Sequence, residues 1–238
     1  MGASVEVRGL SARRGSFLLD DVGLKVAAGE VFAILGQTGS GKTVLLEAIA
    51  GAFQPDSGAV LIEGVDVSRL APGDRGVGVV LQDYALFPHM TVLQNVRYGL
   101  DRMNVPKPEA NAKALEMLEV FGIGQKAHQY PGSISGGEAQ RTALARALVL
   151  EPSVLLMDEP FAAVDPATKR RLYETVRQIH SRFGCTILFV THDFDEAVSL
   201  ADSVGVVLGG KLRLVCPSGE LFDRAVDEDV RFFLGLEK

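Results

Sequence analysis

The sequence predicts an α/β protein with a mixed central sheet, an antiparallel β subdomain and an inserted helical subdomain. Strand-length apolar runs recur along the chain and alternate with segments of helical periodicity. One of these runs leads through a glycine-rich turn directly into a helix, an arrangement typical of parallel sheets. The first residues alternate imperfectly between apolar and polar types, which indicates antiparallel strands beside the parallel ones.

Size and composition favour one domain over residues 1–238. The chain has 238 residues, of which 47% are hydrophobic, so it can bury a large core. Its apolar runs are far shorter than a membrane span, and the N-terminus lacks a basic region followed by an apolar stretch. We therefore expect neither a transmembrane segment nor a secretory signal.

Charge and cysteine content exclude some partners. The formal net charge is −6, and the Lys and Arg residues are scattered, which argues against nucleic-acid binding. Cys185 and Cys216 lack metal-ligand spacing, so buried reduced thiols are the favoured interpretation and the cytosol the default compartment.

The N-terminal segment, residues 4–26, is predicted to form antiparallel strands around a basic turn. The residues expected to point inward are Val5, Val7, Leu18, Val22, Leu24 and Val26. Further strands are predicted at Gly58 to Glu63 and, of the buried parallel type, at Gly76 to Leu81.

A glycine-rich loop after the apolar run 31–35 carries the clearest chemistry. Gly36, Gly41, Lys42 and Thr43 fit the pattern G-x-x-x-x-G-K-[ST] between a strand and a helix. Glycines let the backbone N–H groups surround an anion, and the helix N-terminus, the ammonium and the hydroxyl can reach phosphates and Mg²⁺. A flexible loop before an ordinary helix is the disfavoured alternative. The predicted nucleotide-binding residues of this loop are Gly36, Gln37, Thr38, Gly39, Ser40, Gly41, Lys42, Thr43 and Val44.

A helical insertion is predicted over roughly residues 84–150. Leu115, Leu118 and Phe121 fall at helical spacing, and a break precedes Pro131. Ser135 and two glycines then open another helix, whose unpaired N–H groups offer a second anion site. On these residues alone, a plain serine N-cap is the alternative.

Polar residues end two later apolar runs. Asp158 and Glu159 follow the run 154–157, and His192 comes after the run 186–190. Open α/β sheets place their ligands at the carboxyl ends of their strands, so we expect these side chains in one crevice. A solvated turn and a structural histidine are the alternatives. Apolar residues spaced four, three and four positions apart predict a helix after Asp165. Helices are also expected after His192 and over 220–236.

These motifs resemble those of the ATP-binding subunit of an ABC transporter, and the resemblance covers nearly the whole chain. Its implied fold is the P-loop NTPase fold of ABC ATPases. In the family's order, the motifs are Walker A at Gly36 to Thr43, the Q-loop residue Gln82, the signature at Ser135 to Gln140, Walker B at Val154 to Asp158 with Glu159, the D-loop at Ala162 to Asp165, and the switch histidine His192.

The resemblance implies an ATPase with ATP and Mg²⁺ at its site. Lys42 would bind phosphates and contribute to catalysis, while Thr43, Gln82 and Asp158 would hold Mg²⁺. Glu159 would be the general base that polarises water, with His192 hydrogen-bonded to the γ-phosphate.

The signature residues Ser135, Gly136, Gly137 and Glu138 would contact ATP bound to a second copy of the chain, in a head-to-tail homodimer. Ile134 and Glu138 stand where the common family form has Leu and Gln, a change expected to leave the glycine amides able to act.

The residue that stacks on adenine is left open by the sequence. Either the Phe17 ring or the Arg14 guanidinium plane could do so. Compared with many importer ATPases, the sequence also predicts no regulatory C-terminal domain.

The sequences of the motifs most resemble those of importer ATPases of the molybdate, tungstate and sulfate group. That implies a peripheral location on the cytoplasmic face of the membrane, with transmembrane permease subunits and a solute-binding protein as partners. The contact would be Asp83 to Thr91, where an apolar patch is exposed; the alternative is that these side chains belong to the core of the helical subdomain. The patch consists of Tyr84, Leu86, Phe87 and Met90.

Other functions remain as alternatives. An exporter with separate membrane chains would need the same motifs. A soluble ABC ATPase of translation or DNA repair usually carries two cores or a long coiled coil, for which this chain has no room. A nucleotide sensor would bind ATP without turnover, which Glu159 and His192 argue against.

Overall fold

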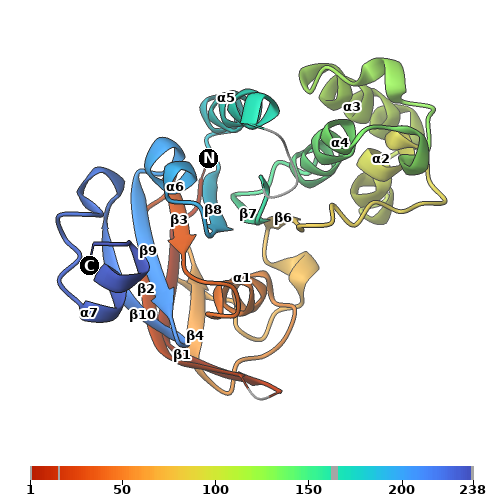
Figure 1. The fold of residues 1–238 in the computed structure, drawn as a ribbon. Coiled ribbons are helices and arrows are strands. Elements are labelled where there is room, and N and C mark those ends of the chain that lie inside the picture. Colours follow the sequence, from red (N-terminus) through yellow and green to blue (C-terminus); the bar gives the residue numbers. More distant parts are fainter. Residues whose placement is uncertain (1, 16, 162–165, 237–238) are drawn as a thin grey trace.

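The protein is described by a computed structural model that covers residues 2–15, 17–161 and 166–236. Its main strands are β3 (Val31–Leu35), β6 (Val77–Val80), β7 (Val154–Asp158), β8 (Thr186–Thr191), β9 (Ser203–Leu208) and β10 (Lys211–Pro217). Within these ranges they form a six-stranded sheet of order β10-β9-β3-β8-β7-β6 (Figure 1). The pairs from β9 to β6 are parallel, whereas β10 is antiparallel to β9. The predicted mixed sheet is confirmed.

A second, antiparallel sheet lies beside the first. Its strands are β1 (Val5–Arg14), β2 (Phe17–Val26), β4 (Ser57–Ile62) and β5 (Val65–Asp66), in the order β2-β1-β4-β5 for the described residues. Helix α1 (Lys42–Ala50) shares one hydrophobic core with β1, β2 and β4 and with one face of the main sheet. The helix that follows the glycine-rich loop is therefore held from both sides.

The parallel strands supply side chains to two cores at once. All five residues of β3 are buried, and they alternate in direction. Phe32 and Ile34 join the core around α1, while Ala33 and Leu35 join the core on the opposite face. This double burial explains why the strands read as continuous apolar runs rather than alternating ones.

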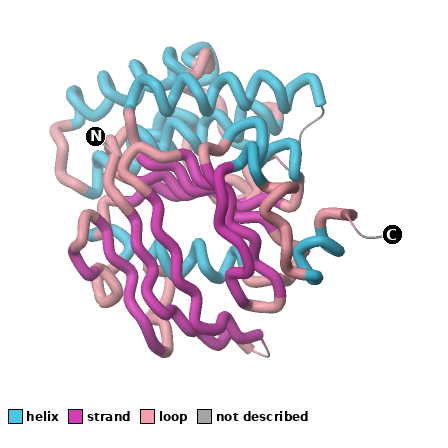
Figure 2. The backbone as a smooth tube through the Cα atoms, turned by 90° about the vertical axis from the view of Figure 1, so that its left-hand side faces the viewer, coloured by secondary structure: helices cyan, strands magenta, loops and turns pink. Residues whose placement is uncertain are grey.

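Helices α2 (Val92–Arg102), α3 (Lys107–Val120) and α4 (Gly136–Leu148) form a group to one side of the main sheet (Figure 1). A capping box begins α2, in which Thr91 accepts a hydrogen bond from the Gln94 amide and the Gln94 side chain accepts one from the Thr91 amide. Helices α5 (Pro166–Phe183), α6 (Phe194–Leu200) and α7 (Glu228–Phe233) complete the chain. In the side view of Figure 2, most helices gather above the strands.

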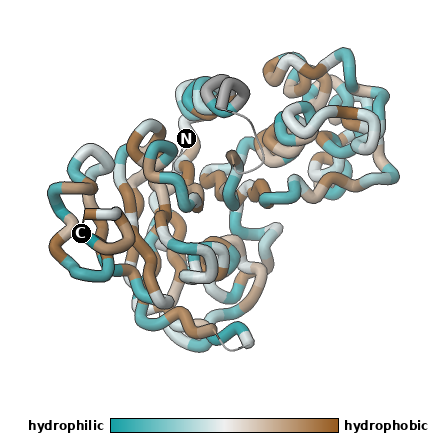
Figure 3. Tube along the Cα trace, viewed as in Figure 1, coloured by the Kyte–Doolittle hydropathy of each residue, from teal (hydrophilic) through white to brown (hydrophobic). Residues whose placement is uncertain are grey.

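Hydrophobic residues concentrate along the central strands, as the colouring of Figure 3 shows. Among the described residues, no helix is long and apolar enough to cross a membrane. Cys185 and Cys216 are both free and buried, as predicted. The single-domain organisation and the lack of a regulatory C-terminal domain stay predictions.

The predicted strands are confirmed, but Leu18 does not point inward. Its side chain is 38% exposed, whereas Leu19 is fully buried. The pairing register shifts between Leu10 with Val22 and Ala12 with Leu19, and Asp21 has a positive φ of 51°. The irregularity places one extra residue in β2 relative to β1. In the part of β2 that precedes it, the inward-facing positions therefore shift by one residue, from Leu18 to Leu19.

Two helical predictions also need correction. Leu115 of α3 is 40% exposed, because the buried face of that helix is formed instead by Ala110, Ala114, Met117 and Leu118. The segment 220–236 is not one helix: α7 alone is an α-helix there, and Asp227 starts it by accepting a hydrogen bond from the Val230 amide.

Arg75 closes the C-terminal end of α1 and is only 4% exposed. Its guanidinium donates to the carbonyls of Ala48 and Ile49 at 2.9 and 3.0 Å, and to those of Ser68 and Leu70 at 3.0 and 3.1 Å. It thus satisfies carbonyl groups that the helix end leaves without partners.

Arg75→Ala is expected to lower the free energy of unfolding by about 2–4 kcal/mol, because it leaves buried carbonyls unpaired and opens a cavity. Urea unfolding measures this loss. The matched control is Arg69→Ala, at an exposed position of the same segment, which is expected to change stability by less than about 0.5 kcal/mol. Equal stability of the two variants would contradict the anchoring role.

Candidate nucleotide site

The glycine-rich loop joins β3 to α1 in a conformation that only glycine permits at two positions. A Cβ on Gly36 would lie 2.2 Å from the Val207 carbonyl oxygen. Gly41, the N-cap residue of α1, has φ +105°, and its Cβ would lie 2.5 Å from the Phe17 ring. The loop backbone is therefore close to both the neighbouring strand and an aromatic side chain.

Lys42 lies at the first position of α1 and is 4% exposed. Its Nζ donates hydrogen bonds to the carbonyls of Gly36 at 2.8 Å and Gln37 at 2.9 Å, at the beginning of the same loop. Burial lowers the pKa of Lys42, while the carboxylates of Glu159 and Asp158 act in the opposite direction. The ammonium is thus enclosed where phosphate oxygens would lie in a loop of this pattern.

A cavity of about 320 Å³ opens over this loop. Its lining residues are Phe17, Thr38, Gly39, Gly41, Lys42, Thr43, Val44, Gln82 and Glu159. The cavity brings together residues from β2, the glycine loop and the ends of β6 and β7, which are far apart in the sequence.

Of the two adenine-stacking alternatives, only Phe17 lines this cavity. The Arg14 guanidinium lies over the Phe53 ring, 4.2 Å from its centroid, and 3.8 Å from the Glu47 carboxylate. Arg14 is therefore already engaged on the outer side of α1, and the geometry favours Phe17.

Asp158 and Thr43 meet at the edge of the cavity. The Thr43 hydroxyl donates to Asp158 Oδ1 at 3.1 Å, and Asp158 is 7% exposed. Burial raises the pKa of Asp158, the Thr43 hydrogen bond lowers it, and the neighbouring Glu159 raises it. A buried carboxylate penalised in this way gains from a nearby cation.

A hydroxyl, a carboxylate and the Gln82 amide are hard oxygen donors of the kind that suits Mg²⁺. Among the described residues, no group of three or more His, Cys, Asp or Glu side chains is arranged so that it could hold a metal ion by itself. Mg²⁺ does not need one, because it is commonly held by one or two carboxylates together with substrate phosphates. The donor set therefore fits the ion.

Glu159 follows β7 directly, with its side chain in the cavity lining. Its backbone has a positive φ of 42°, and its amide donates to the Val190 carbonyl at 3.1 Å. His192, which follows β8, has Nδ1 3.5 Å from Glu159 Oε1 and a side chain that is 56% exposed. The ends of two adjacent strands thus bring an acid and an imidazole together beside the phosphate loop, as predicted.

The serine of the predicted signature is the N-cap of α4. Ser135 Oγ accepts from the Glu138 amide at 3.3 Å, and Glu138 Oε2 accepts from the Ser135 amide at 2.8 Å. Glu138 also lies 3.4 Å from Lys126 Nζ. The backbone hydrogen bond from Ser135 is the main cause that lowers the pKa of Glu138. The unusual Glu138 thus fixes the helix start in a capping box.

Gly136 and Gly137 stay open at this helix start. A Cβ on Gly136 would meet no atom within 4 Å, and one on Gly137 would meet only the Arg141 side chain, at 4.0 Å. Neither glycine lines the cavity over the phosphate loop of the same chain. The structure therefore does not unite the predicted signature with the other predicted site residues.

Two polar contacts near the site have no signal in the sequence. The side-chain amide of Gln140 on α4 donates to the carbonyl of Pro160, the residue after Glu159. Lys169 on α5 pairs with Asp193, the N-cap residue of α6, and with Glu196 in the first turn of that helix. Both join segments that are distant in the sequence, and no local pattern marks them. The predicted D-loop, Ala162 to Asp165, lies outside the described residues.

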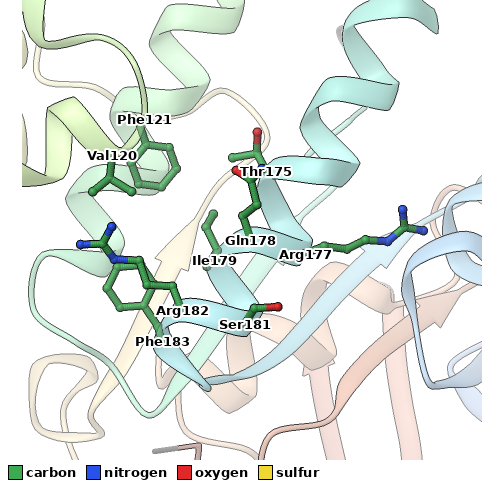
Figure 4. A pocket seen from close by; sticks show the side chains of 9 residues that line it. All are labelled: Val120, Phe121, Thr175, Arg177, Gln178, Ile179, Ser181, Arg182 and Phe183. Carbon is green, nitrogen blue, oxygen red and sulfur yellow. The ribbon is translucent and has the colours of Figure 1, made fainter.

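A larger cavity, of about 520 Å³, lies between the C-terminal ends of α3 and α5 (Figure 4). Val120, Phe121, Ile179 and Phe183 give it apolar walls, with Arg182 beside them. Its described lining includes neither a glycine loop nor a carboxylate. This larger cavity therefore lacks the groups for phosphate chemistry that line the cavity over the glycine loop.

Comparison with known proteins gives consistent results. Residues 19–162 match the family model described as ABC transporter. The molybdate/tungstate import ATP-binding protein WtpC of Thermococcus kodakarensis is 48% identical over 231 residues, which span 97% of this chain and 70% of that protein. A probable sulfate/thiosulfate import ATP-binding protein CysA of Chlorella vulgaris is 40% identical over 235 residues, 98% of this chain and all of that protein.

A solved structure is similar as well. It is described as the dimeric structure of a post-hydrolysis state of the ATP-binding cassette MJ0796 bound to ADP and Pi. The match has a TM-score of 0.81 and 28% sequence identity, and it covers 90% of this chain and 98% of the other.

Proposed function

The chain belongs to the ABC transporter ATP-binding family, an ATPase family, and we propose that its ATP hydrolysis drives solute import through separate membrane permease subunits. The relatives named for molybdate, tungstate and sulfate import support an oxyanion as the solute. Specificity would lie in a permease and a solute-binding protein. The chain would act from the cytoplasmic face of the membrane.

In the proposed ATP complex, Phe17 stacks on adenine and the amides of residues 36–44 surround the phosphates. The Lys42 ammonium then exchanges its bonds to the loop carbonyls for bonds to the phosphate oxygens. Mg²⁺, when held by Thr43, Gln82 and Asp158, would neutralise phosphate charge. The cavity lining and the Thr43–Asp158 hydrogen bond support these assignments.

The hydrolytic roles fall to Glu159 and His192. Glu159 orients the attacking water and accepts its proton, and His192 donates a hydrogen bond to the γ-phosphate as negative charge develops there. Their 3.5 Å separation beside the phosphate loop supports this assignment. Catalysis then depends on positioning and on charge stabilisation rather than on a covalent intermediate.

The observation that supports a site shared between two copies of the chain is that neither Gly136 nor Gly137 lines the phosphate cavity of its own chain. Their open surface and the positive end of α4 suit an anion supplied by another molecule. We assign the signature residues Ser135 to Glu138 to ATP held by a second copy of the chain. The dimeric state of the similar solved structure supports this arrangement.

The test uses sedimentation velocity with MgATP in a Glu159→Gln background, where slow hydrolysis is expected to preserve the ATP-bound dimer. Adding Gly137→Asp is expected to keep the chain monomeric, because a carboxylate would face the partner's phosphates. Binding of a fluorescent ATP analogue to the monomer should stay unchanged. Gly132→Asp is the control, since a Cβ there meets no atom within 4 Å. An undisturbed dimer in the Gly137→Asp variant would refute the shared site.

We further propose that the permease contact involves the segment Asp83 to Thr91. Tyr84 and Leu86 are half-buried against the core, while the Phe87 ring packs at a tilt against Tyr98, with centroids 4.6 Å apart. Arg146 on α4 donates to the Tyr84 and Ala85 carbonyls at 2.8 and 2.7 Å. These side chains thus belong partly to the helical group and partly to the surface, and any movement of a docked permease would reach α4 through Arg146.

A further inference from the structure

His192 lies between two residues whose side chains are fixed by hydrogen bonds. Thr191 Oγ1 accepts from the Asp193 amide at 3.0 Å and donates to Glu196 Oε2. Asp193 is the N-cap of α6, where its Oδ1 accepts from the Asp195 and Glu196 amides at 2.9 and 3.3 Å. The backbone on each side of His192 is therefore tied to the first turn of α6, while the imidazole itself is exposed.

One cation connects these groups to another helix. Lys169, near the start of α5, has its Nζ 2.7 Å from Asp193 Oδ2 and 2.5 Å from Glu196 Oε1. Burial acts to lower the pKa of Lys169, but the hydrogen bonds that its ammonium donates to Asp193 and Glu196 outweigh burial and hold that pKa above its ordinary value. The side chain is therefore a charged bridge between α5 and the loop of His192.

The bridge satisfies a carboxylate that has little contact with water. The Glu196 side chain is only 4% exposed, and its other described partner is the Thr191 hydroxyl. A buried carboxylate that loses its cation must take up a proton or move toward water. Either change weakens the hold on Thr191, and through it the position of the next residue, His192.

We propose that Lys169 is a positioning residue for His192: by holding Asp193 and Glu196 together, it keeps the imidazole at the distance from Glu159 that hydrolysis needs. This rests on the proposed role of His192 at the γ-phosphate. Lys169 does not line the phosphate cavity, and its ion-pair partners among the described residues are Asp193 and Glu196. Its effect is therefore expected in the chemical step and not in nucleotide binding.

The test is the basal ATPase activity of the purified chain. Lys169→Met is expected to lower kcat by at least about tenfold and to leave the KM for ATP within about twofold, because a misplaced group near the chemistry is costly. Lys169→Arg, which can still bridge both carboxylates, is expected to restore most of the lost rate. Arg177→Met is the control: Arg177 also joins α5 to α6, by donating to the Ser199 carbonyl at 2.6 Å, but at the opposite end of α6.

A double-mutant cycle separates positioning from general stabilisation. In a His192→Ala background, Lys169→Met is expected to change kcat by less than about twofold, since there is no imidazole left to position. Equal losses with and without His192, or an equal loss in Arg177→Met, would overturn the proposal. Wild-type kcat in His192→Ala alone would instead refute the proposed role of the histidine.

The proposal can still be tested if the Lys169→Met variant fails to fold. In that case, the double variant Lys169→Met, Glu196→Gln removes the buried carboxylate charge together with the cation that pairs with it, and it undergoes the same comparison with and without His192→Ala. A Tm recorded for every variant shows how much stability each one loses. A lower Tm with an unchanged kcat at a temperature where the chain is folded would assign Lys169 a structural role only and would overturn the proposal.

Discussion

Glu159→Gln is expected to lower the ATP turnover number by about 10²- to 10⁴-fold and to leave ATP binding intact. Glutamine has nearly the same shape but cannot accept the proton of the attacking water. The side chain lines the phosphate cavity, and the positive φ of Glu159 is set by the backbone around it, including the bond from its amide to Val190. Measuring phosphate release under saturating MgATP gives the turnover number.

The control for this variant is Glu151→Gln. Glu151 is also an acidic residue with positive φ, at 51°, but it is exposed and lies outside the nucleotide cavity. Its turnover is expected to equal that of the unmodified chain. Turnover of Glu159→Gln within about threefold of the unmodified chain would mean that another group accepts the proton.

Lys42→Ala is expected to weaken ATP binding by about 100-fold, equivalent to about 3 kcal/mol, because a charge-assisted hydrogen bond to phosphate is lost. The ammonium is buried, donates to two loop carbonyls and lies near the carboxylates of Glu159 and Asp158. Water in its place would not supply the positive charge that binds phosphate. Titration with a fluorescent ATP analogue measures the change in Kd.

Lys113→Ala serves as the control, because Lys113 forms an exposed ion pair with Glu109 on α3, with both side chains about half exposed. Its Kd for ATP is expected to stay unchanged. Circular dichroism of both variants checks that the helices persist. A folded Lys42→Ala chain with full ATP affinity would show that the loop amides alone hold the phosphates.

The arrangement of the site can be predicted from the sequence where one continuous segment both forms a recognisable structural unit and contains the functional residues. Gly36, Lys42 and Thr43 occupy consecutive parts of one strand–loop–helix unit, so their pattern predicts their arrangement. Asp158, Glu159 and His192 were predictable because parallel strands bring their carboxyl ends to one edge. The motif resemblance added Gln82 and the signature, which local patterns do not define.

Contacts between distant segments could not be predicted in this way. The Lys169 pairs and the Gln140–Pro160 hydrogen bond depend on how α4 and α5 pack, and a single sequence contains no local trace of that packing. Leu18 was misplaced because an irregularity in β1 and β2 shifts the inward positions by one residue. Glu138 departs from the common family form, and its capping bonds depend on where α4 starts, which the sequence alone does not define.

The bond between Gln140 and Pro160 has a consequence for a pair of chains. In the proposed dimer, α4 of one chain serves its partner's ATP, while Glu159 serves the ATP of its own chain. The buried Gln140 side chain holds the carbonyl that immediately follows Glu159. Within each chain of that dimer, this contact would connect two different catalytic centres, so a shift of α4 at one nucleotide would reach the general base at the other through a buried hydrogen bond.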